Sequence, residues 1–136
     1  MSEFAKYIGL PWCEHAAGPD AWDCGSFFAH VQRVHFGVDV LADQDRDYAD
    51  GVALALLISG EAEKQGWRNV WEPHHGDLVI VHKPRHVGIW IETPTGPGVL
   101  HCVKGAGVIF TRFAAWGASG FGRREYLRHT GGRHAD

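Results

Sequence analysis

The stretch "HVGIWIETPTGPGVLHCV", residues 86–103, predicts two β-strands joined by a tight turn. Apolar runs flank the segment "TPTGPG", whose glycine and proline residues are typical of a hairpin connection. The alternation of a strand places His86, Gly88 and Trp90 on one face. If the strands pair with His101 opposite Gly88, the two histidines are diagonal neighbours, about 7–8 Å apart at the backbone and within reach of a side-chain hydrogen bond. A register shifted by one residue would place His101 on the other face.

The second half of the chain continues this pattern of strands. Short apolar or alternating runs, separated by glycine and proline, predict an antiparallel sheet of about five strands. The predicted strands cover residues 77–81, 86–92, 98–103, 107–113 and 122–127.

The first half of the chain has the period of a helix instead. Apolar positions between residues 24 and 35 form one stripe at helical spacing, with Asp23 as the expected N-cap and Gly37 as the stop. A second helix is expected over about residues 49–65, ending at Gly66. Helices followed by a meander of strands indicate an α+β domain, in which N-terminal helices pack on an antiparallel sheet.

Length and composition are those of an ordinary globular protein. The chain has 136 residues, a formal net charge of −3 and 45% hydrophobic residues. We expect a single domain, residues 1–136, that needs neither a metal nor a disulfide framework to fold. The absence of a basic bias gives no reason to expect a nucleic-acid partner, and the longest apolar run, residues 52–58, is too short for a membrane span. The N-terminal segment lacks the features of a secretion signal, so we expect synthesis in a cytoplasm.

Cys24 is the first residue of the predicted first helix. The partial positive charge and unpaired amides of a helix N-terminus favour a thiolate, and thiol pKa values of roughly 3.5–7.5 occur in such settings. Cys24 also lies on the apolar stripe, so the pattern allows two interpretations, a packed core thiol or a nucleophile. A nearby base would favour the nucleophile, and His86 with His101 behind it provides a base and an orienting residue if the predicted register holds.

The remaining cysteines and histidines give weaker evidence of a catalytic or metal-binding role. Cys13 follows "PW" with no helix start, and Cys102 should point away from His101 as a core thiol. A zinc site is disfavoured, because the chain has no C-x-x-C pair and adjacent histidines cannot easily direct both rings at one ion. The residues considered for such a site are Cys13, His15, His74, His75 and His82. We expect no metal and no cofactor.

Five motifs, in their order and spacing, resemble the NlpC-like cell-wall cysteine peptidases, a compact branch of the papain-like fold. The motifs are "GLPW" at 9–12, "DCGSFF" at 23–28, "HGDLVIV" at 75–81, "HVGIW" at 86–90 and "GVLHC" at 98–102. The resemblance is strongest to the small hydrolases encoded with phage tail proteins. It implies a papain-like domain in which Cys24 is the nucleophile, His86 the general base and His101 the third, orienting residue.

The resemblance also implies a set of residues around the substrate. They are Trp12, Asp23, Gly25, Ser26, Gly88 and Trp90. The chain departs from the family where Gly25 and then Ser26 follow the cysteine, since Ser and then Gly is usual, and where Trp12 replaces a tyrosine. A tryptophan provides a wall or a stacking surface but no hydroxyl. Oxyanion stabilisation would then depend mainly on the Cys24 amide.

By the same resemblance, the expected substrate is an amide bond in the peptide stem of peptidoglycan. The expected location is the tail tip of a phage or prophage, made in a bacterial cytoplasm and assembled with other tail or baseplate proteins. Two alternatives remain open. One is a structural tail-tip protein of the same fold with little activity, and the other is a bacterial amidase or effector acting on another peptide or acyl substrate.

Overall fold

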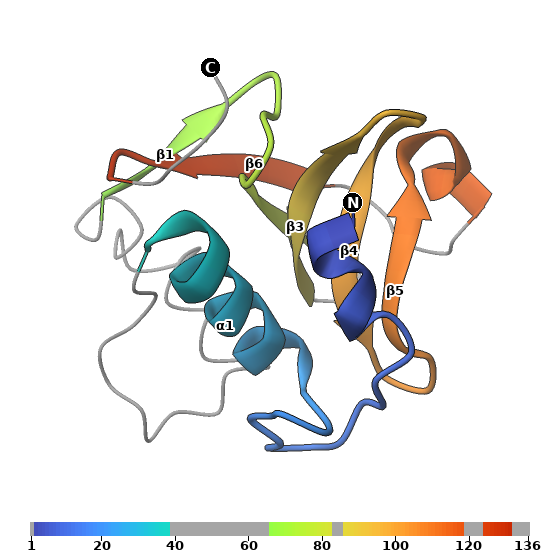
Figure 1. Cartoon of the computed structure of the whole chain (residues 1–136). Coiled ribbons are helices and arrows are strands. Elements are labelled where there is room, and N and C mark those ends of the chain that lie inside the picture. Colours follow the sequence, from blue (N-terminus) through green and yellow to red (C-terminus); the bar gives the residue numbers. More distant parts are fainter. Residues whose placement is uncertain (1, 39–65, 83–85, 119–123, 132–136) are drawn as a thin grey trace.

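A computed structural model of the chain describes residues 2–38, 66–82, 86–118 and 124–131 (Figure 1). Its largest element is a six-stranded sheet in which all neighbouring strands are antiparallel, in the order β1-β6-β2-β3-β4-β5. The strands are β1 (Trp67–Val70), β2 (Leu78–Val81), β3 (His86–Thr93), β4 (Gly96–Val103), β5 (Gly107–Arg112) and β6 (Arg124–His129). The predicted α+β class and antiparallel sheet are confirmed.

The five predicted strands are all present, with ends within two residues of the expected ones. The sixth, β1, is missing from the prediction. It is an edge strand in which only Trp67 is buried, so its four residues carry no alternating pattern. The strand predicted over 107–113 ends at Arg112, and Phe113 begins a short 3-10 helix, η2 (Phe113–Ala118).

Helix α1, Cys24–Phe36, begins and ends as its sequence predicts. The Asp23 side chain accepts a hydrogen bond from the Ser26 N–H (2.8 Å), and the Ser26 hydroxyl accepts one from the Asp23 N–H (3.2 Å). Gly37 closes the other end with a φ of 71°, a left-handed conformation that glycine adopts without strain. Capping of this kind stabilises a helix by about 1 kcal/mol. The second predicted helix, residues 49–65, lies outside the described residues.

Alternation along the strands gives the sheet two buried faces. Helix α1 covers one of them (Figure 1), where Phe27 and Phe28 share the main core cluster with Ile89 and Leu100. The opposite face carries a smaller cluster, whose buried members are Val79, Val81, Trp90, Val99 and Trp116. Because burial of a large apolar side chain contributes about 1.5–3 kcal/mol, both faces stabilise the sheet.

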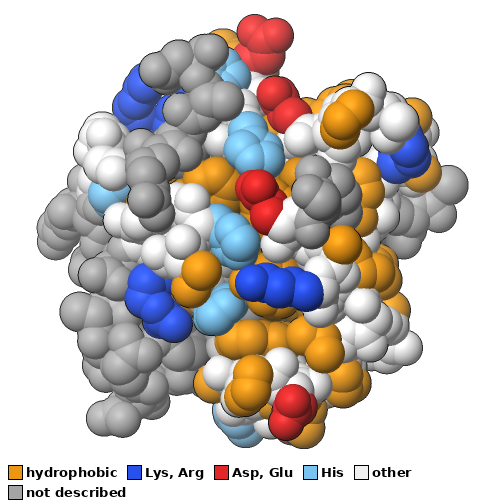
Figure 2. All heavy atoms as spheres, in the orientation of Figure 1, with side chains coloured by type: hydrophobic (Ala, Val, Ile, Leu, Met, Phe, Trp, Pro, Cys, Tyr) orange, Lys and Arg blue, Asp and Glu red, His pale blue; other side chains and the backbone are white. Residues whose placement is uncertain are grey.

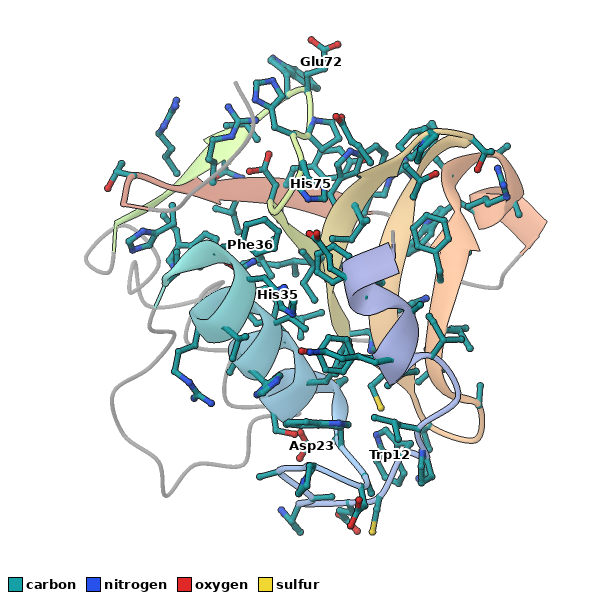
Figure 3. The ribbon with its side chains drawn as sticks, in the orientation of Figure 1. Trp12, Asp23, His35, Phe36, Glu72 and His75 are labelled. Atoms are coloured by element: carbon teal, nitrogen blue, oxygen red, sulfur yellow. The ribbon has the colours of Figure 1, made fainter. Side chains whose placement is uncertain are left out.

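The N-terminal 3-10 helix η1, Ser2–Tyr7, packs beside α1 (Figure 3). The Tyr7 hydroxyl lies 3.2 Å from His30 Nε2 and 2.9 Å from His35 Nε2, and the Phe4 ring centroid lies 4.7 Å from that of His35. Burial lowers the pKa of both histidines, so neutral imidazoles are favoured at this contact. Histidine side chains reach the surface in a row down this face of the molecule (Figure 2).

A buried carboxylate connects the start of β2 to β6. Asp77 is fully buried, and Nε and Nη2 of Arg128 donate to its oxygens at 2.7–3.2 Å. The His74 N–H donates to the same carboxylate at 2.7 Å. A buried charge requires both a counter-ion and hydrogen bonds, so this bidentate pair fixes the position of β6 beside β2.

Replacing Asp77 by asparagine should lower the free energy of unfolding by about 3 kcal/mol, because Arg128 would lose its buried counter-ion. Urea unfolding followed by circular dichroism measures this change. Glu92→Gln is the matched control, since Glu92 is an exposed carboxylate whose replacement should alter stability by less than about 0.5 kcal/mol. Equal effects of the two substitutions would contradict a structural role for Asp77.

Candidate active site

Cys24 is the first residue of α1 and is 7% exposed, within the main core cluster. The thiol therefore combines a mostly buried position with a helix N-terminus, whose partial charge favours a thiolate. The other two cysteines differ from it. Cys13 is exposed, whereas Cys102 is fully buried with its Sγ 3.3 Å from the Trp22 carbonyl oxygen. Burial raises the pKa of Cys102 to about 12, so that thiol stays protonated at neutral pH.

His86 and His101 lie side by side on neighbouring strands. Ile89 pairs with Leu100, which is the one of the two registers left open by the sequence that sets His101 opposite Gly88. Nε2 of His86 and Nδ1 of His101 are 2.8 Å apart, the distance of a hydrogen bond. The two side chains are almost completely buried, with 6% and 0% exposure. The sequence thus places the proposed base and its proposed orienting residue in direct contact.

Gly88 and Thr111 complete the surroundings of this pair. A Cβ on Gly88 would lie 2.6 Å from a Val99 methyl carbon and 3.1 Å from the Cβ of His101, so the pairing needs a residue without a side chain. The Thr111 hydroxyl on β5 lies 2.8 Å from Nε2 of His101. Sequence reasoning missed Thr111. The sequence feature that could have indicated it is its position on the strand that follows His101. Thr111 pairs with Val99, which is two residues from His101, so Thr111 and His101 lie on the same face.

Burial lowers the pKa of His86 to about 4. Burial and the neighbouring His86 lower the pKa of His101 to about 3. Both rings are therefore neutral at pH 7, and each carries one proton. If Nε2–H of His101 donates to Thr111, Nδ1 of His101 accepts from Nε2–H of His86. In this tautomer the proton of His86 lies on Nε2, so Nδ1 is the basic nitrogen that a general base would use.

The thiol and the imidazoles belong to different faces of the sheet. His101 and Cys102 are neighbours on β4 and therefore point to opposite sides. Cys102 shares the α1 face with Cys24 in the main core cluster. His101 lies on the other face, where its ring stacks on Trp116 with 6.1 Å between centroids. The sequence interpretation grouped the three residues without this separation.

The histidine pair and the start of α1 lie at the same end of the β3–β4 hairpin. Strand β3 begins at His86, and β4 ends two residues after His101, whose side chain is hydrogen-bonded to that of His86. At the same end, the Cys102 thiol contacts the carbonyl of Trp22, two residues before Cys24. The start of α1 is thus held at the end of the sheet where the histidine pair lies.

Three residues expected near the substrate, Asp23, Gly25 and Ser26, form the start of α1. Asp23 and Ser26 are 2% and 6% exposed and cap the helix through reciprocal hydrogen bonds. The Ser26 hydroxyl also donates to the carbonyl oxygen of Ala16 at 2.6 Å. These side chains hold the turn that presents Cys24, which is a positioning role.

The two tryptophans expected near the substrate have different surroundings. Trp90 is 5% exposed and packs edge-on against Phe113 and Tyr126, at 5.4 and 5.6 Å between ring centroids. Trp12 is half-buried, and the Lys104 ammonium lies 5.5 Å from its ring centroid. Trp12 therefore offers a surface to a ligand, whereas Trp90 is mainly part of the smaller core cluster.

Replacement of His101 should produce a graded loss of activity if it orients His86. His101→Ala removes the acceptor for the His86 N–H and should lower kcat/KM about 10–100-fold. His101→Asn keeps an acceptor oxygen near the position of Nδ1 and should lower it less. Steady-state kinetics on a stem-peptide substrate compare the two. Equal losses of kcat/KM in the two variants, or losses that unfolding explains in both, would contradict an orienting role for His101.

Among the residues described, no three histidine, cysteine, aspartate or glutamate side chains form a group that could hold a metal ion. No helix within these parts of the chain has the length and apolar character needed to cross a membrane. A scan against protein-family models and a search of curated proteins both gave no match.

Proposed function

We propose that the chain is a cysteine hydrolase that cleaves an amide bond in the peptide stem of peptidoglycan. Cys24 is the nucleophile, His86 the general base and His101 the orienting residue. The observation that carries this proposal is the buried chain of contacts from His86 through His101 to Thr111, at the end of the sheet where α1 begins. The motif resemblance to NlpC-like peptidases, with their papain-like fold, supplies the substrate class.

In the proposed reaction, Nδ1 of His86 takes the proton of the Cys24 thiol, and the sulfur attacks the amide carbonyl carbon. A C–S bond forms, the C–N bond breaks, and His86 gives its proton to the leaving amine. A water molecule then attacks the thioester, with His86 accepting its proton. The C–S bond breaks, the carboxylic acid is released, and His86 returns the proton to the Cys24 sulfur. The Cys24 backbone N–H is the proposed oxyanion donor.

The proposed setting is the tail tip of a phage or prophage, where the chain would act with other tail or baseplate proteins. The order of the five motifs supports this setting, since the resemblance is strongest to hydrolases encoded with tail proteins. The alternative enzyme with the same mechanism is a bacterial amidase or effector that acts on another peptide or acyl substrate. Assay of cell-wall peptides beside unrelated acyl substrates separates the two.

One observation favours a second candidate, a structural tail-tip protein with little activity. Cys24 and His86 are 7% and 6% exposed, and His101 is fully buried. Such burial leaves little of the thiol and the imidazole accessible to a substrate carbonyl. In the structural alternative, the histidine pair only stabilises the β3–β4 hairpin.

Incubation of the full chain with purified peptidoglycan fragments tests the proposal. Each cleaved amide yields one new amine and one new carboxylate, which mass spectrometry detects as two products whose summed mass exceeds that of the substrate by one water. We expect such products from stem peptides and none from sugar chains without peptides. The absence of products from every stem peptide tested would support the structural alternative.

A further inference from the structure

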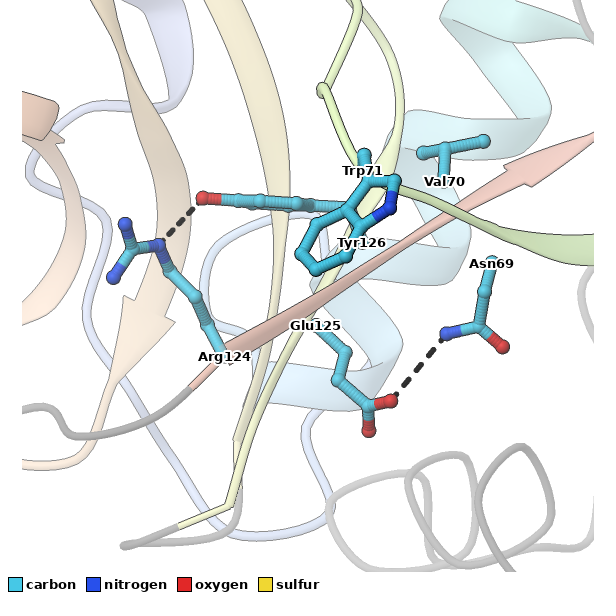
Figure 4. A pocket seen from close by; sticks show the side chains of 6 residues that line it. All are labelled: Asn69, Val70, Trp71, Arg124, Glu125 and Tyr126. Carbon is cyan, nitrogen blue, oxygen red and sulfur yellow. Dashed lines mark hydrogen bonds between the residues drawn. The ribbon is translucent and has the colours of Figure 1, made fainter.

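A concave site lies at the edge of the sheet, where β1 pairs with β6. It has a volume of about 450 Å³, within the range of small-molecule sites. Its lining residues are Asn69, Val70, Trp71, Arg124, Glu125 and Tyr126 (Figure 4). The proposed hydrolase mechanism uses none of them.

An exposed indole forms one wall of this pocket. Trp71 directly follows β1 and is 97% exposed, the highest value among the large apolar side chains described. Val70 pairs with Tyr126, and Tyr126 and Trp71 both line the pocket (Figure 4). A tryptophan that is 97% exposed gains little from the core, so its place at the rim of a concave site is typical of a ligand surface.

Polar groups stand on both sides of the aromatic wall. On one side, the Glu125 carboxylate lies 3.4 Å from Nδ2 of Asn69 and 2.7 Å from Nε2 of His82. On the other side, Nε of Arg124 donates to the Tyr126 hydroxyl, and the guanidinium lies 5.8 Å from the Tyr126 ring centroid. Both charged groups are thus held in place by neighbours, which reduces the entropy lost on binding.

We propose that this pocket binds a pyranose ring of an N-acetylated glycan. The C–H face of a pyranose is apolar and flat enough to stack on the Trp71 indole, while its hydroxyls project sideways toward the Glu125 and Asn69 side. The acetamido carbonyl is a neutral acceptor suited to the Arg124 guanidinium. The choice of sugar rests on the proposed function, because peptidoglycan joins its stem peptides to N-acetylated sugars. The pocket would hold the glycan strand while the proposed active site acts on the stem.

Isothermal titration of the full chain with tri-N-acetylchitotriose, a peptide-free probe, tests this pocket. We expect binding that weakens at least about tenfold in Trp71→Ala, a change that should leave the melting temperature unaltered because the side chain is exposed. Val34→Ala is the matched control, since Val34 is an exposed apolar residue on α1 and should bind as the unaltered chain does.

Three results would overturn the assignment. They are no binding of the probe, equal binding by Trp71→Ala, and equal binding of cellotriose, which lacks acetamido groups. Cleavage of a sugar-free stem peptide, measured in parallel, should be the same with and without Trp71→Ala. Failure of the glycan site is therefore distinguishable from failure of the proposed hydrolase, which that second assay reports alone.

Discussion

Amine release from a stem peptide should fall to the uncatalysed background when Cys24 is replaced by alanine. The proposed reaction forms a covalent bond to the Cys24 sulfur, and alanine has no atom that can replace it. The loss should therefore be far larger than that caused by any change at His101, which acts through His86 alone. Product formation measured by mass spectrometry over several hours gives the sensitivity that the comparison needs.

Controls separate loss of chemistry from loss of fold. Cys24 lies in the core cluster, so Cys24→Ser, which nearly preserves its volume, should be tested beside Cys24→Ala, with circular dichroism of both. Cys13→Ala removes the exposed thiol and should retain full activity. Turnover that persists in folded Cys24→Ala would show that another group performs the reaction.

Acidification should destabilise the fold by an amount on the order of 5 kcal/mol between pH 7 and pH 4. The pKa of His86 is lowered to about 4 and that of His101 to about 3, whereas both lie near 6.5 in the unfolded chain. Below pH 6.5 the unfolded chain therefore binds protons that the folded chain excludes. Stability from the neutral pair is fully present above pH 6.5 and is lost as the pH falls toward the folded values.

Urea unfolding at several pH values between 7.5 and 4 measures this slope. His101→Asn removes one of the two titrating rings and should flatten the dependence, even if it lowers stability at pH 7. His15→Asn is the matched control, because the His15 side chain is 64% exposed and its removal should leave the slope unchanged. An unaltered slope in His101→Asn would contradict the neutral, buried pair.

Local sequence patterns predicted the elements that local chemistry determines. Asp23 and Gly37 gave the ends of α1, because caps require particular side chains or a left-handed backbone. The helix ends depend on residues close in sequence, which is why one sequence was sufficient for them. The turn residues between β3 and β4 predicted a hairpin but left two registers open, and the register that forms brings His86 and His101 together.

Features that depend on distant contacts were not predictable in this way. Strand β1 forms because the edge of β6 is available to pair with it, although its own four residues carry little pattern. Thr111 became part of the histidine chain only through the pairing of β4 with β5. The separation of Cys24 and His101 onto different sheet faces follows from where α1 packs, and the sequence does not specify that face.

Detection of an acyl group on Cys24 is the most direct test that this thiol is the nucleophile. The full chain carrying Cys13→Ala, which removes the exposed thiol, would be mixed with an activated ester of a stem-peptide acyl group and quenched in acid. We expect a mass increase of one acyl group, located by fragmentation on Cys24 and absent when Cys24 is also replaced by alanine. An unmodified Cys24, or an acyl group found on Cys102 instead, would show that Cys24 is not the nucleophile.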